Sequence, residues 1–245
     1  MTAPALAQAT DYGRGYLHPL TGEFVPSVTT AIKMIHKEAL EAWKLRTAAK
    51  YADQNWDYLA KMGSGDRIQL IQDAHLAEST PKADLGTVIH EVCDNWIKGV
   101  PSESAKETKS YVTSFTQFLM DYRPRFITTE VTIWSRSAGY AGTADAIAEI
   151  NDRNWILDWK TGRGVYPEYA LQMAALRNGD FIIDPDGTER EMPRIDFSGV
   201  VQIRPRSYKF FPIMEDEACF SAFLGALEIF RWQQETAEFT IGEPM

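Results

Sequence analysis

Two short apolar segments on either side of a polar cluster constrain the fold of this chain more than any other feature. Residues 144–150 and 155–160 are rich in apolar, β-branched and aromatic side chains, and the polar residues 151–154 separate them. Short apolar runs of this kind, divided by turn-forming residues, indicate two strands and a tight connection. The sequence therefore predicts a β-hairpin over residues 144–160.

The hairpin carries two carboxylates and a lysine. With the turn centred on Asp152 and Arg153, Asp145 lies opposite Lys160. Because side chains alternate along a strand, Asp158 and Lys160 share one face, and Asp145 joins them from the neighbouring strand. Neighbours on one face of a sheet are about 4.5–8 Å apart, which suits the binding of one small cation.

Two buried carboxylates at this distance repel each other unless a cation lies between them. Mg²⁺ and Mn²⁺ prefer oxygen ligands, which Asp145, Asp158 and the backbone carbonyl of Trp159 offer. Lys160 is then placed to orient a water molecule or to stabilise negative charge, as metal-assisted phosphodiester hydrolysis requires. A surface hairpin with one Asp–Lys ion pair is the alternative, and the spacing alone does not decide between them.

Three other segments add polar side chains in a fixed order. His90 lies near the start of an apolar run with helical periodicity, and Glu130 heads a run typical of a strand. Gln172 begins a further helical run after the loop that follows Lys160. The predicted order is a helix with His, a strand with Glu, the hairpin, and a helix with Gln.

In this order the chain resembles the PD-(D/E)XK nuclease superfamily, in the branch of RecB-type nuclease domains, Cas4-like exonucleases and the phage-type or mitochondrial genome maintenance exonucleases. The matching motifs, in chain order, are Val25-Pro26-Ser27-Val28-Thr29-Thr30-Ala31-Ile32, Gly86-Thr87-Val88-Ile89-His90, Glu130, Gly142-Thr143-Ala144-Asp145, Asp158-Trp159-Lys160-Thr161-Gly162 and Gln172. The resemblance covers roughly residues 16–210. It implies an α/β fold of the restriction-endonuclease type, with a central mixed sheet flanked by helices in the order αβββαβ.

The resemblance also implies a role for each matching residue. His90, Asp145, Asp158 and the Trp159 carbonyl would bind Mg²⁺ or Mn²⁺, and Lys160 would serve the attacking water. Glu130 and Gln172 would support the site. Two departures accompany the match. Only Cys93 and Cys219 are present, so we expect no iron–sulfur cluster, which usually needs four thiolates, and Leu176 replaces an aromatic residue that the family usually carries after the Gln.

The resemblance and the helical patterns together suggest three regions. We expect a flexible N-terminus at residues 1–15, a helical arm at residues 16–80, and a nuclease core with a C-terminal helix at residues 81–245. The arm could cover the site and guide a single strand, whose bases aromatic side chains could stack on. The predicted substrate contacts are Trp43, Lys44, Arg46 and Arg163.

Composition sets further bounds. The net charge of −9 argues against long-range attraction to bulk DNA, although basic residues gather locally. No apolar run approaches the roughly 20 residues that span a bilayer, and two distant cysteines suggest reduced thiols. We therefore expect a cytoplasmic protein, of a bacterium or a phage-infected cell, without a membrane partner.

The expected activity is a metal-dependent deoxyribonuclease, and an exonuclease acting on single-stranded DNA or DNA ends is favoured. It would act in replication, recombination or repair, with proteins of those processes as potential partners. A structure-specific endonuclease of the same fold is the first alternative. The second is a DNA-binding recombination subunit with an inactive nuclease site, against which the complete Asp and Asp-x-Lys set argues.

Overall fold

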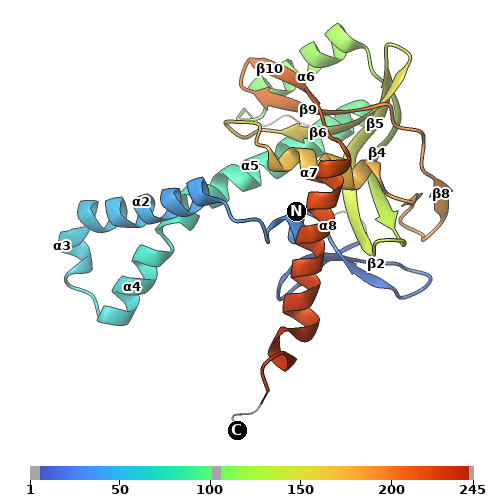
Figure 1. Cartoon of the computed structure of the whole chain (residues 1–245). Helices are drawn as coiled ribbons and strands as arrows, with labels where there is room; N and C mark the ends of the chain where they lie inside the picture. The colour runs from blue at the N-terminus through green and yellow to red at the C-terminus, as the bar shows by residue number, and fades with distance from the viewer. Residues whose placement is uncertain (1–5, 101–105, 243–245) are drawn as a thin grey trace. The chain divides into compact units, whose positions relative to one another are not determined.

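A computed structural model describes residues 6–100 and 106–242 of the chain (Figure 1). The strands, in chain order, are β1 Ala7–Thr10, β2 Gly13–Leu17, β3 Phe24–Pro26, β4 Arg125–Ser135, β5 Tyr140–Ile150, β6 Arg153–Lys160, β7 Phe181–Ile183, β8 Glu189–Glu191, β9 Phe197–Arg204 and β10 Ser207–Ile213. The helices are α1 Val28–Ile32, α2 Glu38–Gln54, α3 Trp56–Leu59, α4 Ser64–Gln72, α5 Ala74–Ile97, α6 Lys109–Tyr122, α7 Glu168–Arg177 and α8 Glu217–Arg231, which two short helical turns, Trp232–Thr236 and Ala237–Phe239, follow.

The described residues form two compact units. One contains residues up to Ile35 together with Ile89 onwards, and the other contains His36–Val88. The first unit is built on a seven-stranded sheet with the order β10-β9-β6-β5-β4-β7-β8. All neighbours in this sheet are antiparallel except β6 and β9, which run parallel.

The parallel pair gives the sheet its mixed character and follows from the long connection between β6 and β9. A parallel return needs a crossover, and α7 supplies it. The described order α5-β4-β5-β6-α7-β9 contains the predicted αβββαβ sequence, with α6 and the β7–β8 hairpin as additions. The predicted α/β class with a central mixed sheet and N-terminal helices is confirmed.

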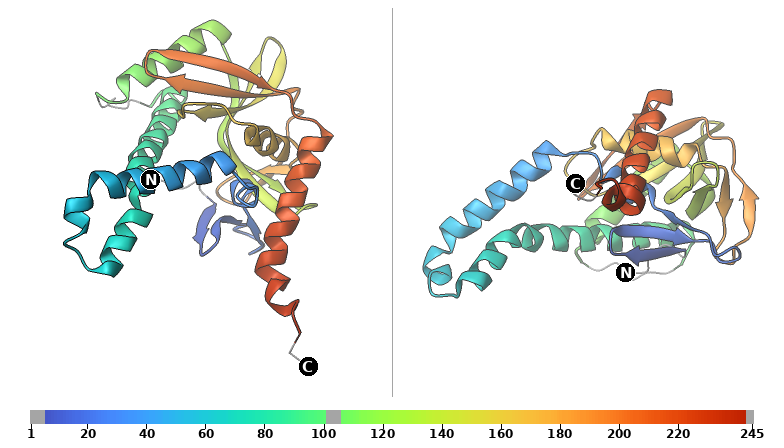
Figure 2. Two further views of the ribbon diagram at one scale, coloured as in Figure 1. Left: turned by 60° about the vertical axis from the view of Figure 1, so that its left-hand side comes forward. Right: turned by 60° about the horizontal axis from the view of Figure 1, so that its bottom comes forward.

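Helices pack on the sheet through apolar side chains. α7 packs against α8 and α1, and Figure 2 shows α8 running past α7 and continuing beyond the sheet. Met173 and Leu176 of α7 and Phe223 of α8 are fully buried in this core. Burial of side chains of this size stabilises the fold by about 1.5–3 kcal/mol each.

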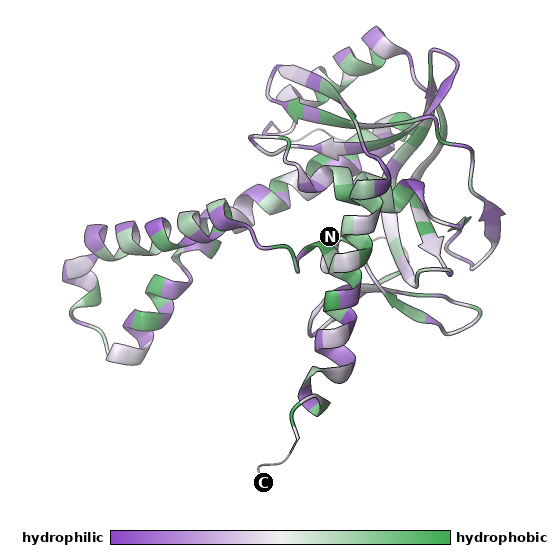
Figure 3. Cartoon of the chain, viewed as in Figure 1, coloured by the Kyte–Doolittle hydropathy of each residue, from purple (hydrophilic) through white to green (hydrophobic). Residues whose placement is uncertain are grey.

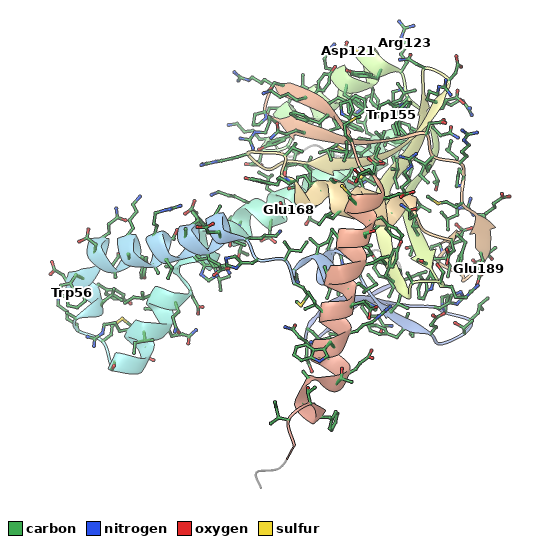
Figure 4. The ribbon with its side chains drawn as sticks, viewed as in Figure 1. Trp56, Asp121, Arg123, Trp155, Glu168 and Glu189 are labelled. Carbon is green, nitrogen blue, oxygen red and sulfur yellow. The ribbon has the colours of Figure 1, made fainter. Side chains whose placement is uncertain are left out.

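α6 packs against β9 and β10 through aromatic rings. Phe115 and Phe118 of α6 lie edge-on to Trp159 of β6, with ring centroids 5.3 and 6.0 Å apart. Trp155, near the start of β6 and labelled in Figure 4, packs on Phe210 of β10 with ring centroids 5.1 Å apart. Trp159 thus anchors β6 to the α6 layer.

The N-terminal residues belong to the first unit. β1, β2 and β3 form a three-stranded antiparallel sheet. Leu6 and Tyr16 pack with Trp134 and Phe181 of the large sheet, and the Tyr16 hydroxyl lies 2.9 Å from the Thr143 hydroxyl. Residues 7–10, where the sequence predicts a flexible segment, therefore form a paired strand, whereas residues 1–5 lie outside the described chain.

The second unit, His36–Val88, contains α2, α3, α4 and the first part of α5. Its bounds differ from those predicted for the arm, 16–80, because residues 16–35 pack with the large sheet. α2 packs on α4, yet neither helix contains a buried residue. Figure 3 shows hydrophilic and hydrophobic residues mixed along both helices. The described helices, here and in the first unit, lack the combined length and apolar composition needed to cross a membrane.

The predicted β5–β6 hairpin is present, but its predicted register is wrong by two residues. Ile150 pairs with Arg153, so Asn151 and Asp152 alone form the turn, with φ angles of 52° and 58°. Asn and Asp adopt the left-handed conformation more readily than other residues, and two of them in succession favour the two-residue hairpin turn. Continuing the observed register puts Asp145 level with Asp158 and not, as predicted, with Lys160.

Candidate metal and nuclease site

Asp158 and Lys160 lie at the end of β6 and face α7. The Lys160 Nζ atom donates to Asp158 Oδ1 at 2.9 Å and lies 2.7 Å from Oδ2. Gln172 Nε2, from α7, donates to the same Oδ1 at 2.9 Å. Asp158 is 3% exposed. The strand alternation that points Trp159 toward α6 therefore points both charged neighbours toward α7.

Asp145 connects β5 to β6 and to α5. Its Oδ2 accepts a hydrogen bond from the backbone N–H of Trp159 at 2.5 Å, and its Oδ1 lies 3.1 Å from Nδ1 of His90. The β5–β6 ladder of paired residues ends at Ala146 and Leu157. The Asp145 carboxylate thus satisfies a backbone donor at the point where regular pairing stops.

Glu130 reaches the same place from β4 by an unusual backbone conformation. Its φ angle is 49°, a value that is costly for a residue with a Cβ atom. Ligand atoms of His90, Glu130 and Asp145 all lie within 4.8 Å of one another. Strain of this kind, held by the surrounding strands, is typical of functional sites. These three residues form a candidate metal-binding cluster.

Burial and mutual charge perturb the acid–base groups. Burial opposes protonation of His90, but Asp145 and, more weakly, Asp158 raise its pKa to about 9. Glu130 is exposed as a residue, yet partial burial of its carboxyl group and the charge of Asp145 raise its pKa to about 7. Without a cation, His90 and Glu130 therefore bind protons more strongly than isolated side chains do.

The pKa values of the two aspartates are shifted in opposite directions. Burial opposes ionisation of Asp145, but His90 and Lys160 lower its pKa. Burial is the main cause that raises the pKa of Asp158, and the nearby Asp145 charge adds to it. Burial also opposes the charge of Lys160, yet the two aspartates raise its pKa. Lys160 consequently carries its proton at neutral pH and acts here as a fixed positive charge.

Two residues near the cluster were not predicted from the sequence. Asp94 lies one helical turn after His90, pairs with Lys98 at 2.7 Å, and has a buried Oδ1 atom without a hydrogen-bond partner in the described chain. The ring of Tyr169 lies under Lys160, with Nζ 4.9 Å from its centroid. The spacing i, i+4 from His90 could have indicated Asp94, since residues four apart share a helix face.

The predicted substrate contacts fall in both units. Within the helical unit, Trp43 lies edge-on to His75 at 6.3 Å and Lys44 pairs with Glu41 at 2.8 Å, while Arg46 is exposed. In the other unit, Arg163 is exposed on the loop that follows Lys160. Their roles in substrate binding stay predictions.

Comparisons with known proteins give distant likenesses. No family model and no curated protein matches the chain. Among solved structures, the chain is similar to SSO0001, with 15% identity, 85% of each chain covered and a TM-score of 0.35. It is also similar to the alkaline exonuclease LHK-Exo from Laribacter hongkongensis, with 16% identity, 63% of this chain and 86% of that chain covered, and a TM-score of 0.32.

The complex of LHK-Exo with dAMP matches to the same extent, with 17% identity, the same two covered shares and a TM-score of 0.32. Likenesses this distant carry no conclusion about this chain. Its own sheet topology makes it a mixed α/β protein, and its site contains a candidate cluster of acidic residues and histidine.

Proposed function

We propose that this chain is a metal-dependent DNA exonuclease of the PD-(D/E)XK superfamily, acting on single strands or DNA ends. The observation that carries the proposal is the convergence of His90, Glu130 and Asp145 beside the Asp158–Lys160 pair. Five groups from one helix and three strands meet at one place, and an ordinary surface ion pair requires no such assembly.

The donor set fits a hard divalent cation. Carboxylate oxygens with one imidazole nitrogen suit Mg²⁺ or Mn²⁺ better than a soft metal. In an extended strand, the N–H and the C=O of one residue point toward the same neighbouring strand. Because the Trp159 N–H points to Asp145, its carbonyl is expected on that side too. His90, Asp145, Asp158 and the Trp159 carbonyl would hold the ion, with Glu130 beside them.

The bound cation would supply Lewis acidity and a water molecule of lowered pKa. The protein groups would do the rest. Lys160, held by Asp158 and Tyr169, keeps its charge and can orient the attacking water and stabilise developing negative charge. Gln172 donates to Asp158 and so would orient the carboxylate that holds the ion. These roles agree with those implied by the family resemblance.

The proposal is tested by digestion of single- and double-stranded oligonucleotides labelled at the 5′ or 3′ end. We expect cleavage with Mg²⁺ or Mn²⁺ and none with a chelator, with mononucleotides released from one end. Circular single-stranded DNA separates the alternatives, because an exonuclease cannot cut it and an endonuclease can. If calorimetry finds no binding of either metal and no oligonucleotide is cut, the proposal is wrong and an inactive DNA-binding subunit takes its place.

A further inference from the structure

The loop between β6 and α7, residues 161–167, begins at the lysine of the candidate site and is fixed at its start. Gln202 Nε2 donates to the carbonyl of Gly162 at 2.8 Å, and Arg204 Nη1 donates to the carbonyl of Thr161 at 2.7 Å. Both donors lie on or at the end of β9, the parallel neighbour of β6. The backbone that leaves the site is therefore tied to the sheet.

Two tyrosine rings continue outward from Lys160. Tyr169 lies under the ammonium group at 4.9 Å, and Tyr166 lies edge-on to Tyr169, with centroids 5.9 Å apart and planes at 73°. The Tyr166 carbonyl also accepts a hydrogen bond from the Tyr169 N–H at 3.0 Å. A continuous path of contacts thus leads from the catalytic lysine to the Tyr166 ring.

The Tyr166 ring is held in place but remains open to solvent. A Cβ atom on Gly164 would lie only 3.3 Å from its Cζ atom, so the loop backbone closely supports the ring from one side. Tyr169 supports it from another side, and the residue is still 49% exposed. Single exposed aromatic residues are common on protein surfaces. This one differs because it is fixed on two sides and lies two contacts from Lys160.

The loop also carries a positive charge. Arg163 is exposed and forms no hydrogen bond or ion pair among the residues that the structure describes. A fixed aromatic ring with a cation on the same loop is a combination that suits single strands, because bases stack on the ring and the cation can contact phosphate. Bases inside a duplex are already stacked and cannot offer a face in the same way.

We propose that Tyr166 stacks on an unpaired nucleobase next to the scissile phosphate and so makes the site selective for single-stranded or frayed ends. This inference rests on the proposed nuclease function and adds to it the residue that selects the unpaired substrate. Arg163 would contact the phosphate of the same nucleotide. Tyr166 acts in binding, so its loss should affect KM far more than kcat.

The test combines protein and substrate changes in one cycle. Single-stranded oligonucleotides carry one abasic residue, moved stepwise from the digested end, and wild type is compared with Tyr166→Ala and Tyr166→Phe in Mg²⁺. For wild type we expect KM to rise roughly ten-fold when the abasic residue occupies one particular position. For Tyr166→Ala, KM should already be raised roughly ten-fold on the strand without an abasic residue. An abasic residue at that position should then raise KM no further. Tyr166→Phe should behave as wild type.

Tyr12→Ala is the matched control, since Tyr12 is similarly exposed and also lies edge-on to one aromatic partner, Phe230. It should keep the wild-type response to every abasic position. Equal sensitivity of Tyr166→Ala and wild type at every position overturns the inference while the nuclease function stands.

A wild type that cuts no strand contradicts the nuclease function instead. The same cycle is then read from the binding of fluorescent oligonucleotides without cleavage. If the abasic residue weakens the binding of wild type and of Tyr166→Ala equally at every position, or if no oligonucleotide binds, the inference is overturned.

Discussion

The β5–β6 hairpin and the helical unit His36–Val88 are under different physical constraints. The hairpin is paired with strands on both sides, and the side chains of Asp145 and Asp158 are almost completely buried. In the helical unit, neither α2 nor α4 has a buried residue, and Trp56 is 58% exposed. Sheet pairing therefore fixes the position of the groups to which the proposed function assigns the reaction, whereas the predicted contacts on α2 occupy surfaces that tolerate change. Substitutions in the two regions should therefore differ greatly in effect.

The largest effect is expected for Lys160→Ala. Removal of a fixed positive charge that stabilises a transition state lowers kcat about 100- to 1000-fold. Single-turnover cleavage in Mg²⁺ measures this loss, and circular dichroism checks that the variant folds. Lys209→Ala, an exposed lysine on β10, is the control and should keep kcat within about two-fold of wild type. Full activity of Lys160→Ala would refute the assignment.

An intermediate effect is expected for Glu130→Gly, which should raise the melting temperature and lower the activity. The φ angle of 49° costs a non-glycine residue about 1–2 kcal/mol, which glycine avoids. The metal-free variant should melt roughly 2–4 °C higher per kcal/mol recovered. Its activity should fall about 10- to 100-fold because a carboxylate beside the metal is lost.

Glu130→Ala separates the two consequences. It removes the carboxylate but keeps a Cβ atom, so activity should fall to the same extent without the gain in melting temperature. Equal melting temperatures of the Gly and Ala variants would show that the backbone at this position is not strained.

The smallest effect is expected for Arg46→Ala in the helical unit. If Arg46 contacts one phosphate of a single strand, its loss should weaken binding about three-fold and reduce the slope of log K against log salt by about 0.7. Fluorescence anisotropy at several salt concentrations measures both. Arg194→Ala, a highly exposed arginine with a loose contact of 3.8 Å to Asp196, is the control. A hundred-fold loss for Arg46→Ala would contradict the contrast between the two regions.

The sequence predicted the main strands and helices of the site because their signals are local. Short apolar runs and a polar turn identified β5 and β6, and helical periodicity located His90 and Gln172. The register was wrong because four polar residues were interpreted as the turn, whereas Asn151 and Asp152 alone form it with positive φ angles. Side-chain composition does not reveal how many residues of such a cluster remain in the strands.

Other features depend on tertiary contacts that no local pattern reports. The left-handed conformation of Glu130 in the middle of β4 is imposed by its neighbours in the sheet, since glutamate does not favour it. Likewise, the packing of residues 6–35 on the large sheet arises from contacts such as Tyr16 with Trp134. Helical patterns follow residues 16–35 in the sequence, so the predicted helical arm includes them.

The alternation of side chains along Asp158-Trp159-Lys160 bears on how mutation would remove the proposed activity. Trp159 packs on Phe115 and Phe118 of α6, so the positions of Asp158 and Lys160 depend on an aromatic layer that is fully buried. A displacement of about 1 Å can cost a hundred-fold in rate. Mutations in this aromatic layer can therefore displace the charged pair while every charged residue remains intact. Under the proposed function, drift in α6 is a route by which descendants of this chain would lose catalysis before losing their fold.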